Sequence, residues 1–324
     1  MHDQFKRSIE YLRISITDRC NLRCSYCMPA HGVNWLPPRD ILTYEEILRV
    51  VRLSVDLGFK KFRVTGGEPL VRKGILPFLG NLAAIPGVED LTLTTNGILL
   101  APLAGRLKAA GVRRVNVSLD TLDPGKFSTV TRGGKLNNVL KGIEKSLEVG
   151  LNPVKVNVVV MRGFNDDELE RLVDMARDYP LHIRFIELMP IGASANRRSQ
   201  LITVDEMQQR LAFLNLIPAR GLEGAGPAKN FTAEGLKGTI GFISALSQHF
   251  CAGCNRIRLT PDGKIKPCLH SAQEYDLRQL LRSGIPDEQL KEAIAEVVWH
   301  KPSQHRMSVE GWEGRNRVMS QIGG

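Results

Sequence analysis

The sequence has no long hydrophobic run: nowhere in its 324 residues do about 18 consecutive apolar residues occur, the length that a membrane-spanning helix needs. The first residues, Met1-His2-Asp3-Gln4, lack the basic-then-apolar pattern of a signal peptide. Cysteine is scarce, with six residues, and cysteines that serve as thiolate ligands need a reducing compartment. We therefore expect a cytoplasmic protein without a membrane partner.

Basic residues are in excess, but they are not arranged as in nucleic-acid-binding proteins. The net charge is +10, which can indicate nucleic acid, an acidic membrane surface or a small polyanion as the partner. However, the sequence contains no run of five or more Lys or Arg and no interleaved basic and aromatic stretch. Several basic residues fall inside predicted strands instead, which favours a bound anion over nucleic acid.

The most informative cysteines are Cys20, Cys24 and Cys27, here called the first triad, which follow a predicted strand with Cys-x3-Cys-x2-Cys spacing. Three thiolates at this spacing can hold three irons of a [4Fe–4S] cluster and leave the fourth iron without a protein ligand. Tyr26 lies between the last two cysteines. A structural zinc site would need four ligands, usually from paired Cys-x2-Cys halves.

The remaining cysteines, Cys251, Cys254 and Cys268, form the second triad. Alone, this group is as consistent with a zinc knuckle completed by His249 or His270 as with a second iron–sulfur cluster. Beside the first triad, a second cluster with one iron free for a ligand is the preferred interpretation.

Strand-like and helix-like segments alternate up to about Met189. Six such units imply a parallel sheet with right-handed crossovers, and six are two fewer than a closed eight-fold barrel contains. We predict an α/β fold, a partial (β/α)6 TIM-like barrel whose open side is covered by a smaller C-terminal α+β domain. The predicted strands are Tyr11–Thr17, Lys60–Thr65, Val88–Thr95, Val112–Leu119, Val154–Val160 and His182–Leu188. The predicted helices are Thr43–Gly58, with a capping box, Ile75–Ala84, Leu99–Ala110, Lys135–Val149 and Asp166–Asp178.

One face of nearly every strand is polar at a period of two, whereas strands buried on both faces should be almost continuously apolar. Because buried cations are costly without a partner, we predict a cationic lumen that holds an anionic ligand. Each of five strand ends also carries distinctive residues, as expected for an active site at that end of a barrel. The polar faces comprise Arg13, Ser15 and Thr17; Lys61, Arg63 and Thr65; Thr92, Thr94 and Asn96; Asn116, Ser118 and Asp120; Lys155 and Asn157; His182 and Arg184.

The pattern changes after Pro190. A second capping box at Thr203 predicts a helix to about Leu214, and the Gly-rich stretch Arg220–Gly238 is predicted to be a loop. We divide the chain into a barrel domain, residues 1–219, and a C-terminal domain, residues 220–324. The latter is predicted to contain strands Thr239–Ser244, Arg256–Thr260 and Lys264–Pro267 and helices Asp276–Arg282 and Asp287–Trp299.

The first triad, the Gly66-Gly67-Glu68-Pro69 turn and the partial barrel together resemble the radical S-adenosylmethionine (SAM) enzymes. Further segments are similar to the GTP 3′,8-cyclase family of molybdenum cofactor biosynthesis, over essentially the whole chain. These segments are Tyr11–Cys20, Arg184–Glu187, Gly226–Ala228, Cys251–Arg258 and the terminal Gly323-Gly324.

The resemblance implies two [4Fe–4S] clusters, one on each triad, with SAM as cosubstrate and GTP as substrate. The SAM-binding residues would be Tyr26, Gly67, Ser118 and Met189. The GTP-binding residues would be Arg13, Arg63, Thr94, Lys155, Arg184, Arg256, Ile257 and Arg258, of which Arg13, Arg256 and Arg258 would be catalytic.

The resemblance also implies a lyase-class reaction. Reductive cleavage of SAM would give a 5′-deoxyadenosyl radical that removes the 3′ hydrogen of GTP, and the C3′ radical would attack C8. Reduction of the cyclised radical, with uptake of one electron and one proton, would yield 3′,8-cyclo-7,8-dihydro-GTP. Implied partners are an external electron donor of flavodoxin or ferredoxin type, the downstream cyclic pyranopterin monophosphate synthase and a second copy of the chain in a homodimer.

Three other functions fit parts of the sequence. A radical SAM enzyme acting on a peptide or a sugar would share both triads but would offer no triphosphate to the inward cations. A zinc-dependent nucleic-acid-binding protein would explain the charge and would be colourless. A ferredoxin-like electron carrier would need a much shorter chain.

Overall fold

The computed structural model describes residues 1–219, 226–307 and 317–323, and its centre is one twelve-stranded sheet. The six predicted strands are confirmed and pair in parallel in chain order. They are β1 (Tyr11–Ser15), β2 (Lys61–Thr65), β3 (Asp90–Thr95), β4 (Arg114–Ser118), β5 (Lys155–Val160) and β6 (His182–Glu187). In the described residues, none of the helices is long and apolar enough to cross a membrane.

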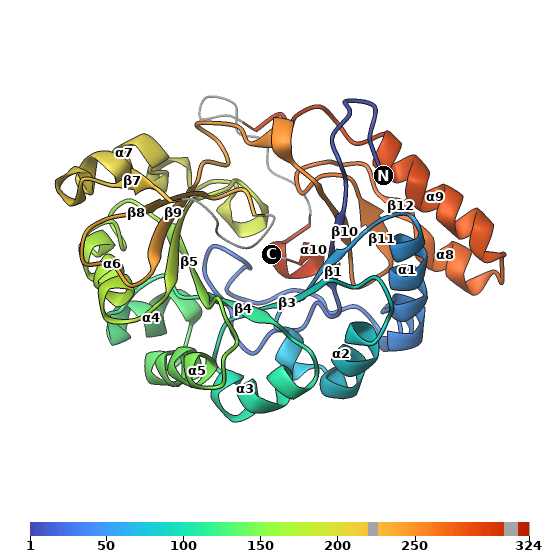
Figure 1. Cartoon of the computed structure of the whole chain (residues 1–324), viewed down its shortest axis with the longest axis horizontal. Helices are drawn as coiled ribbons and strands as arrows, with labels where there is room; N and C mark the ends of the chain where they lie inside the picture. Colours follow the sequence, from blue (N-terminus) through green and yellow to red (C-terminus); the bar gives the residue numbers. More distant parts are fainter. Residues whose placement is uncertain (220–225, 308–316, 324) are drawn as a thin grey trace.

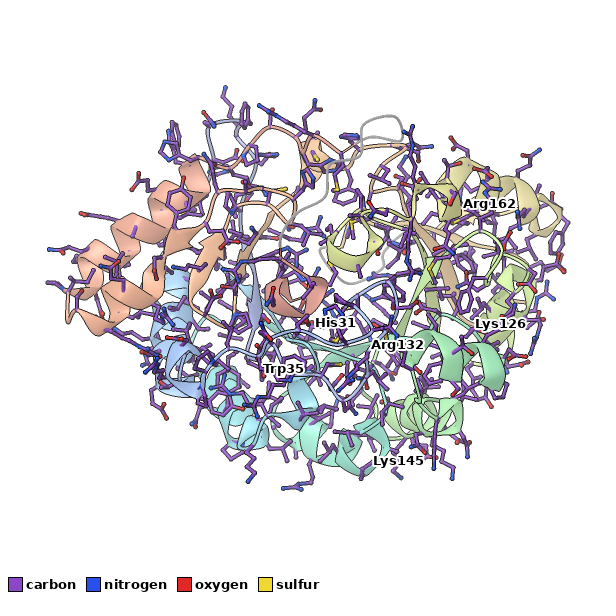
Figure 2. The ribbon with its side chains drawn as sticks, turned by 180° about the vertical axis from the view of Figure 1, so that it is seen from behind. His31, Trp35, Lys126, Arg132, Lys145 and Arg162 are labelled. Atoms are coloured by element: carbon purple, nitrogen blue, oxygen red, sulfur yellow. The ribbon has the colours of Figure 1, made fainter. Side chains whose placement is uncertain are left out.

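Figure 1 shows the helices that connect these strands as an arc on the outer side of the sheet. They are α1 (Tyr44–Asp56), α2 (Ile75–Ala83), α3 (Leu100–Ala109), α4 (Pro124–Thr131), α5 (Leu136–Glu148) and α6 (Leu169–Asp178). Their outward faces carry charged residues such as Lys145 of α5, whose ammonium pairs with Glu148 at 2.7 Å (Figure 2).

Helix α1 illustrates how the local sequence produces these elements. The predicted capping box is present: the Thr43 hydroxyl accepts from the Glu46 amide at 3.1 Å, and the Glu46 carboxylate accepts from the Thr43 amide at 2.7 Å. The helix ends at Asp56, and Gly58 follows with a φ of +89°, the left-handed conformation that favours glycine.

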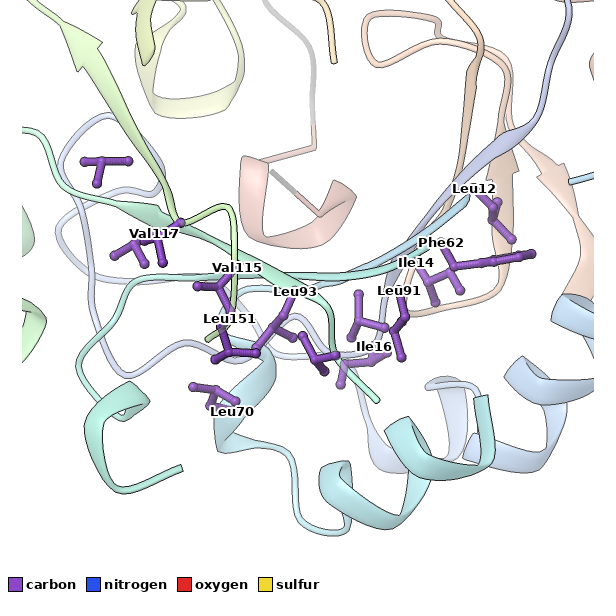
Figure 3. Close-up of a cluster of buried hydrophobic side chains, with 14 of the residues drawn as sticks. Leu12, Ile14, Ile16, Phe62, Leu70, Leu91, Leu93, Val115, Val117 and Leu151 are labelled. Atoms are coloured by element: carbon purple, nitrogen blue, oxygen red, sulfur yellow. The ribbon is translucent and has the colours of Figure 1, made fainter. Parts of the chain in front are cut away.

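The hydrophobic core lies between the sheet and this arc of helices. The outward-facing residues of the strands, including Leu12, Phe62, Leu93 and Val115, have no exposed surface and pack in one continuous cluster (Figure 3). Burial of each such side chain contributes about 1.5–3 kcal/mol. Since the apolar residues occupy this face, the alternating polar residues are directed to the inner side of the sheet.

The C-terminal part of the chain joins the same sheet at both edges. Strand β10 (Arg256–Leu259) pairs in parallel with β1, and β9 (Thr239–Ile243) pairs in parallel with β6. Antiparallel strands then extend each edge: β11 (Lys264–Lys266) and β12 (Tyr275–Asp276) beyond β10, and β8 (Lys229–Thr232) and β7 (Ile217–Pro218) beyond β9. The sheet ends at β12 and β7, so the barrel is not closed. Division of the chain at residue 219 stays a prediction.

The remaining helices are α7 (Val204–Arg210), α8 (Leu277–Arg282), α9 (Asp287–Trp299) and α10 (Met319–Ile322). The short helix α10, close to the C-terminus, lies on the inner side of the sheet (Figure 1).

Three details of the sequence prediction were wrong. The segment Arg220–Gly238 is not all loop, because β8 forms within it by pairing with β9; residues 220–225 lie outside the described part. Helix α4 was missed, although Asp123 caps it by accepting from the Lys126 amide at 2.7 Å and Pro124 occupies its first position. Helix α7 is shorter than expected and is followed by a separate 3-10 turn at Ala212–Leu214.

Candidate active site

A cavity of about 300 Å³ lies on the inner side of the sheet, near the C-terminal ends of the strands. It is lined by residues from both halves of the chain, including the predicted SAM residues Tyr26, Gly67, Ser118 and Met189. Its wall also includes every cysteine of the protein: Cys20, Cys24, Cys27, Cys251, Cys254 and Cys268. The two triads, far apart in sequence, therefore open onto one space.

The first triad lies on the loop after β1, which is fixed on both sides by backbone contacts. The Ser25 amide donates to the Val130 carbonyl at 2.8 Å, and the Gly67 amide donates to the Thr17 carbonyl at 2.7 Å. A Cβ at Gly67 would lie 2.4 Å from the Arg19 carbonyl oxygen, so only glycine allows this close approach. The Gly-Gly-Glu-Pro turn thus supports the cysteine loop directly.

The thiols of the first triad are in surroundings that disfavour the free thiolate. Burial raises the pKa of Cys20 to about 11 and that of Cys27 to about 12. Burial, followed by the charges of Cys27 and Asp120, raises the pKa of Cys24 as well. Since a metal ligand must be deprotonated, a bound metal centre has to displace these protons.

The geometry of the triads argues against a single metal ion. In the described part of the chain, only one set of three Cys, His, Asp or Glu ligand atoms lies within 4.8 Å of one another, and this set is His249, Cys251 and His305. Neither triad is this compact. Three sulfurs that are spread more widely suit a multi-iron cluster better than one zinc ion, whose bonds to sulfur are about 2.3 Å long.

Tyr26 is held beside the first triad by Asp120. Its hydroxyl donates to Asp120 Oδ2 at 2.7 Å, while the Val159 amide donates to Asp120 Oδ1 at 2.9 Å. Burial raises the pKa of Asp120 to about 6. This wall of the cavity therefore combines an aromatic side chain and a buried carboxyl group with the sulfurs.

Three arginines form a row across adjacent strands on the inner face. Arg258 of β10 is in register with Arg13 of β1, and Arg13 is in register with Arg63 of β2. Burial, then the charges of Arg258 and Arg63, lowers the pKa of Arg13. Burial and Arg256 lower the pKa of Arg258 to about 10. The row is a concentration of positive charge that an anion would relieve.

Further polar atoms at this wall are unsatisfied within the protein. In the described residues, Arg63 Nε, Arg184 Nε and Thr94 Oγ1 are buried and have no hydrogen-bond partner. Burial and the charge of Arg63 lower the pKa of Arg184 to about 9. Buried donors without acceptors are rare in folded proteins, so these atoms fit a ligand that supplies acceptors.

Two predicted substrate residues do not line this cavity. Lys155 is buried at the first position of β5, deeper than Asn157 and Val159, which do line it. Burial, then Arg184, lowers the pKa of Lys155 to about 6. The side chain of Ile257 has no exposed surface and packs in the hydrophobic core on the outer face, so it cannot contact a ligand in the cavity.

The second triad is placed by a 3-10 turn at Cys251–Gly253 and by the end of β11. The buried Lys301 was not predicted from sequence: its ammonium donates to the carbonyls of Arg256 at 2.9 Å and Pro267 at 2.6 Å. It therefore joins the segments that carry Cys254 and Cys268.

A second residue missed from sequence is Arg7, which forms an ion pair with Asp3 at 2.6 Å. Its guanidinium donates to the carbonyls of Cys251 at 2.9 Å and Pro302 at 2.7 Å. Arg7 and Lys301 come from segments distant from the cysteines, so no local motif marks either of them.

The charges around Cys254 are opposite to those around the first triad. Burial alone would raise the pKa of this thiol, but the charges of Arg256 and Lys301 outweigh burial and lower the pKa to about 6. Arg256 Nη2 lies 3.7 Å from the sulfur, and its guanidinium lies 5.1 Å from the ring centre of Phe250.

The histidine set offers a limited alternative. The rings of His249 and His305 stack with centroids 4.3 Å apart beside Cys251, whereas the Met307 amide donates to His305 Nδ1 at 3.2 Å. The compact set contains Cys251 but not Cys254 or Cys268, so a zinc ion there would use only one cysteine of the second triad.

The C-terminal segment reaches the cavity. Met319 and Ser320 of α10 line it, and Arg258 Nη1 donates to the Gly323 carbonyl at 2.8 Å. Gly323 has a φ of +81°, and a Cβ there would lie 2.7 Å from the Cβ of Ser15. Gly323 thus contacts an arginine of the cavity wall, and Gly324 lies outside the described residues.

Comparison with known proteins agrees with this arrangement. The radical SAM superfamily matches residues 14–176, and the family described as Molybdenum Cofactor Synthesis C matches residues 181–307. The chain is 51% identical to a GTP 3′,8-cyclase of Heliobacterium modesticaldum over 327 residues and 50% identical to one of Moorella thermoacetica over 325 residues. Each alignment covers 100% of both chains.

Among solved structures, Streptococcus suis SuiB is similar in fold. With its precursor peptide SuiA bound, it matches with a TM-score of 0.61 and 16% identity, covering 89% of this chain and 67% of SuiB. With SAM bound, SuiB matches with a TM-score of 0.58 and 17% identity, covering 89% of this chain and 68% of SuiB. The structural likeness supports the partial barrel, and the full-length sequence identity shows that this chain belongs to the GTP 3′,8-cyclase family of radical SAM enzymes.

Proposed function

We propose that this protein converts GTP to 3′,8-cyclo-7,8-dihydro-GTP, the first step of molybdenum cofactor biosynthesis, with SAM as cosubstrate. The observation that carries the proposal is that both cysteine triads and the arginine row line one cavity. A triphosphate suits this cavity because arginine forks pair well with phosphate oxygens.

The first triad would hold the [4Fe–4S] cluster that the radical SAM family requires, and the second triad would hold another. When bound, these centres supply the electron for SAM cleavage and an open iron site for the guanine base. The wide spacing of the sulfurs and the glycine contact at Gly67 fit this assignment.

The protein's own side chains would bind and orient the two small molecules. Tyr26, Gly67, Ser118 and Met189 lie on the cavity wall with the first triad and would bind SAM. Arg256 and Arg258 lie next to the second triad and would position the nucleotide at the centre held there. The remaining GTP contacts would come from Arg13, Arg63, Thr94 and Arg184. Lys155, also expected to bind GTP, lies outside the cavity wall and would have to move to reach the nucleotide. Ile257 could contribute through its main chain alone.

Further partners belong to the same proposal. The reaction would draw electrons from a flavodoxin- or ferredoxin-type donor in the cytoplasm, and cyclic pyranopterin monophosphate synthase would consume the product. A homodimer, and division of the chain at residue 219, are also proposed.

The test is anaerobic reconstitution with iron, sulfide, SAM, GTP and dithionite, followed by chromatographic separation and fragment-mass analysis of the nucleotide. The expected product has the mass of GTP and a cyclised connectivity, formed with 5′-deoxyadenosine and methionine. Unchanged GTP together with SAM cleavage would contradict the proposal. Failure to bind GTP by isothermal titration would instead favour a radical SAM enzyme acting on a peptide or a sugar.

A further inference from the structure

The net positive charge of the chain is concentrated in three segments, residues 19–39, 124–143 and 188–204. Together they contain nine Lys and Arg and no Asp or Glu, although the chain carries 34 acidic residues. The net charge of the whole chain is +10, so the rest of the sequence is almost neutral. This charge is not needed for the arginine row, which lies in other segments.

Hydrogen bonds join these three segments into one surface, here called the basic face. The Arg23 amide donates to the Thr131 carbonyl at 3.1 Å, and Arg132 Nη1 donates to the Arg23 carbonyl at 2.7 Å. From the third segment, Arg197 Nη2 donates to the Ser25 carbonyl at 3.0 Å. The segments are therefore adjacent in space and not only alike in composition.

Several of the charges on the basic face point to solvent. Arg23, Lys135 and Arg198 are exposed, and their side chains take part in no ion pair within the described residues. Other exposed cations are paired, for example Lys145 with Glu148 at 2.7 Å and Arg162 with Glu206 at 2.6 Å. Within the basic face, Lys126 is the exception, since it pairs with Asp167 at 2.8 Å.

The basic face covers the first triad. Its first segment is the loop that carries Cys20, Cys24 and Cys27, and Arg23 lies immediately before Cys24. In the view of Figure 2, Arg132, His31 and Trp35 lie in the middle of one side of the molecule, with Lys126, Lys145 and Arg162 toward its periphery. Trp35 is 38% exposed on this side.

From this placement we propose that the basic face is the docking surface for a small acidic electron-carrier protein. The proposal rests on the proposed function, which requires one electron at the first triad for each SAM cleaved. One electron would pass from the donor's reduced cofactor to the iron–sulfur centre, so the donor is oxidised and the centre reduced by one electron. Opposite charges would bring the carrier over the loop that holds that centre.

The position of the charge favours this partner over nucleic acid. Electron tunnelling slows steeply with distance, so a carrier must dock near the centre that it reduces. Binding of nucleic acid has no such requirement.

The experiment measures reduction of the iron–sulfur centres by stopped-flow absorbance, without GTP or SAM, using a fully reduced acidic flavodoxin as the probe. In the double variant Arg23→Glu/Lys135→Glu, we expect reduction at low salt to slow at least tenfold. The difference from wild type should shrink as salt is raised, because screening removes the steering charge. Reduction by dithionite, iron content and sulfide content should stay unchanged.

Lys145→Glu is the matched control, since it reverses an exposed charge on the outer face of α5, and it should leave reduction by flavodoxin unchanged. A second variant, Arg198→Glu, changes the third segment and should also slow reduction by flavodoxin only. Wild-type rates in the double variant would overturn the proposal. If reduction by dithionite slowed as much as reduction by flavodoxin in the double variant and in Arg198→Glu, the proposal would also be overturned. The substitutions would then have altered the iron–sulfur centre and not the docking of the carrier. The reduction assay contains no GTP, so it can still be interpreted if the protein does not cyclise GTP. The proposed docking surface and the proposed function can therefore fail independently.

Discussion

The two cysteine triads face the same cavity but have opposite electrostatic surroundings. Near the first triad, burial and the carboxylates of Glu68 and Asp120 disfavour additional negative charge. Near the second triad, Arg256 and Lys301 favour the thiolate of Cys254. The cysteines of the first triad therefore lie in an anionic environment and Cys254 of the second triad lies in a cationic one, although both triads line the same cavity.

This difference suggests that the iron–sulfur centres on the two triads have different reduction potentials and different roles. Reduction adds negative charge to an iron–sulfur centre, and nearby cations stabilise the reduced state. A centre on the second triad should therefore be the easier one to reduce, and it should attract an anionic substrate. A centre on the first triad should remain a stronger reductant, which suits cleavage of SAM.

Removing one cysteine from each triad should separate these roles most strongly. In Cys24→Ala, 5′-deoxyadenosine should fall below detection, because the site for SAM is lost. In Cys254→Ala, SAM cleavage should persist while the cyclised nucleotide disappears. Chromatography of both products checks this, and retained deoxyadenosine in Cys24→Ala would remove the distinction between the triads.

Substitution of the arginines of β10 should weaken binding of the substrate and spare the cosubstrate. We expect Arg258→Ala or Arg256→Ala to weaken GTP binding about tenfold to a hundredfold, since a hydrogen bond to a charged group contributes about 1.5–3 kcal/mol. Uncoupled SAM cleavage should continue. Isothermal titration with both ligands measures this, with Arg162→Ala on the outer surface as the control. Equal loss of SAM affinity would contradict the assignment.

Lys301 provides a direct test of the charge difference. Lys301→Met removes a buried ammonium near Cys254 and two hydrogen bonds to carbonyls, so the reduction potential of the second centre should become more negative. We expect a shift of about 60 mV or more, which corresponds to a tenfold change for a one-electron couple. Redox titration followed by electron paramagnetic resonance should show the first centre unchanged.

Lys301→Arg keeps the charge and should retain most of the wild-type potential. A change of iron content without any change of potential in Lys301→Met would mean that Lys301 has only a structural role.

In the metal-free protein, the thiols of the two triads should also differ in their reactivity, and this is the smallest of the expected effects. The pKa of Cys254 is lowered to about 6, so its thiolate is present above pH 6 and is lost as the pH falls through 6. Cys20 and Cys27, with pKa values raised to about 11 and about 12, should be protonated at neutral pH. Iodoacetamide at pH 7 should label Cys254 first, as peptide mass mapping can establish. Preferential labelling of Cys20 would reverse the comparison.

Most of the barrel could be predicted because its signals are local. A capping box marks the start of α1, and alternation of polar and apolar residues marks each strand and its inner face. The same alternation shows that Ile257, between Arg256 and Arg258, points away from the cavity, a signal that motif matching overlooked.

The remaining features depend on tertiary contacts. Strand β8 forms because β9 offers a free edge, and its sequence contains little strand signal of its own. Lys301 and Arg7 reach the second triad from distant segments. Their sequence neighbourhoods resemble ordinary helix ends and turns, so only the folded structure shows what they contact.

The central claim is that each triad assembles its own four-iron centre. Iron and sulfide analysis of anaerobically reconstituted protein tests it most directly, with Cys24→Ala and Cys254→Ala measured in parallel. We predict about eight irons and eight sulfides per chain in the wild type and about four of each in either variant. Zinc in place of iron at the second triad, or about four irons in the wild type and none in Cys24→Ala, would contradict the account.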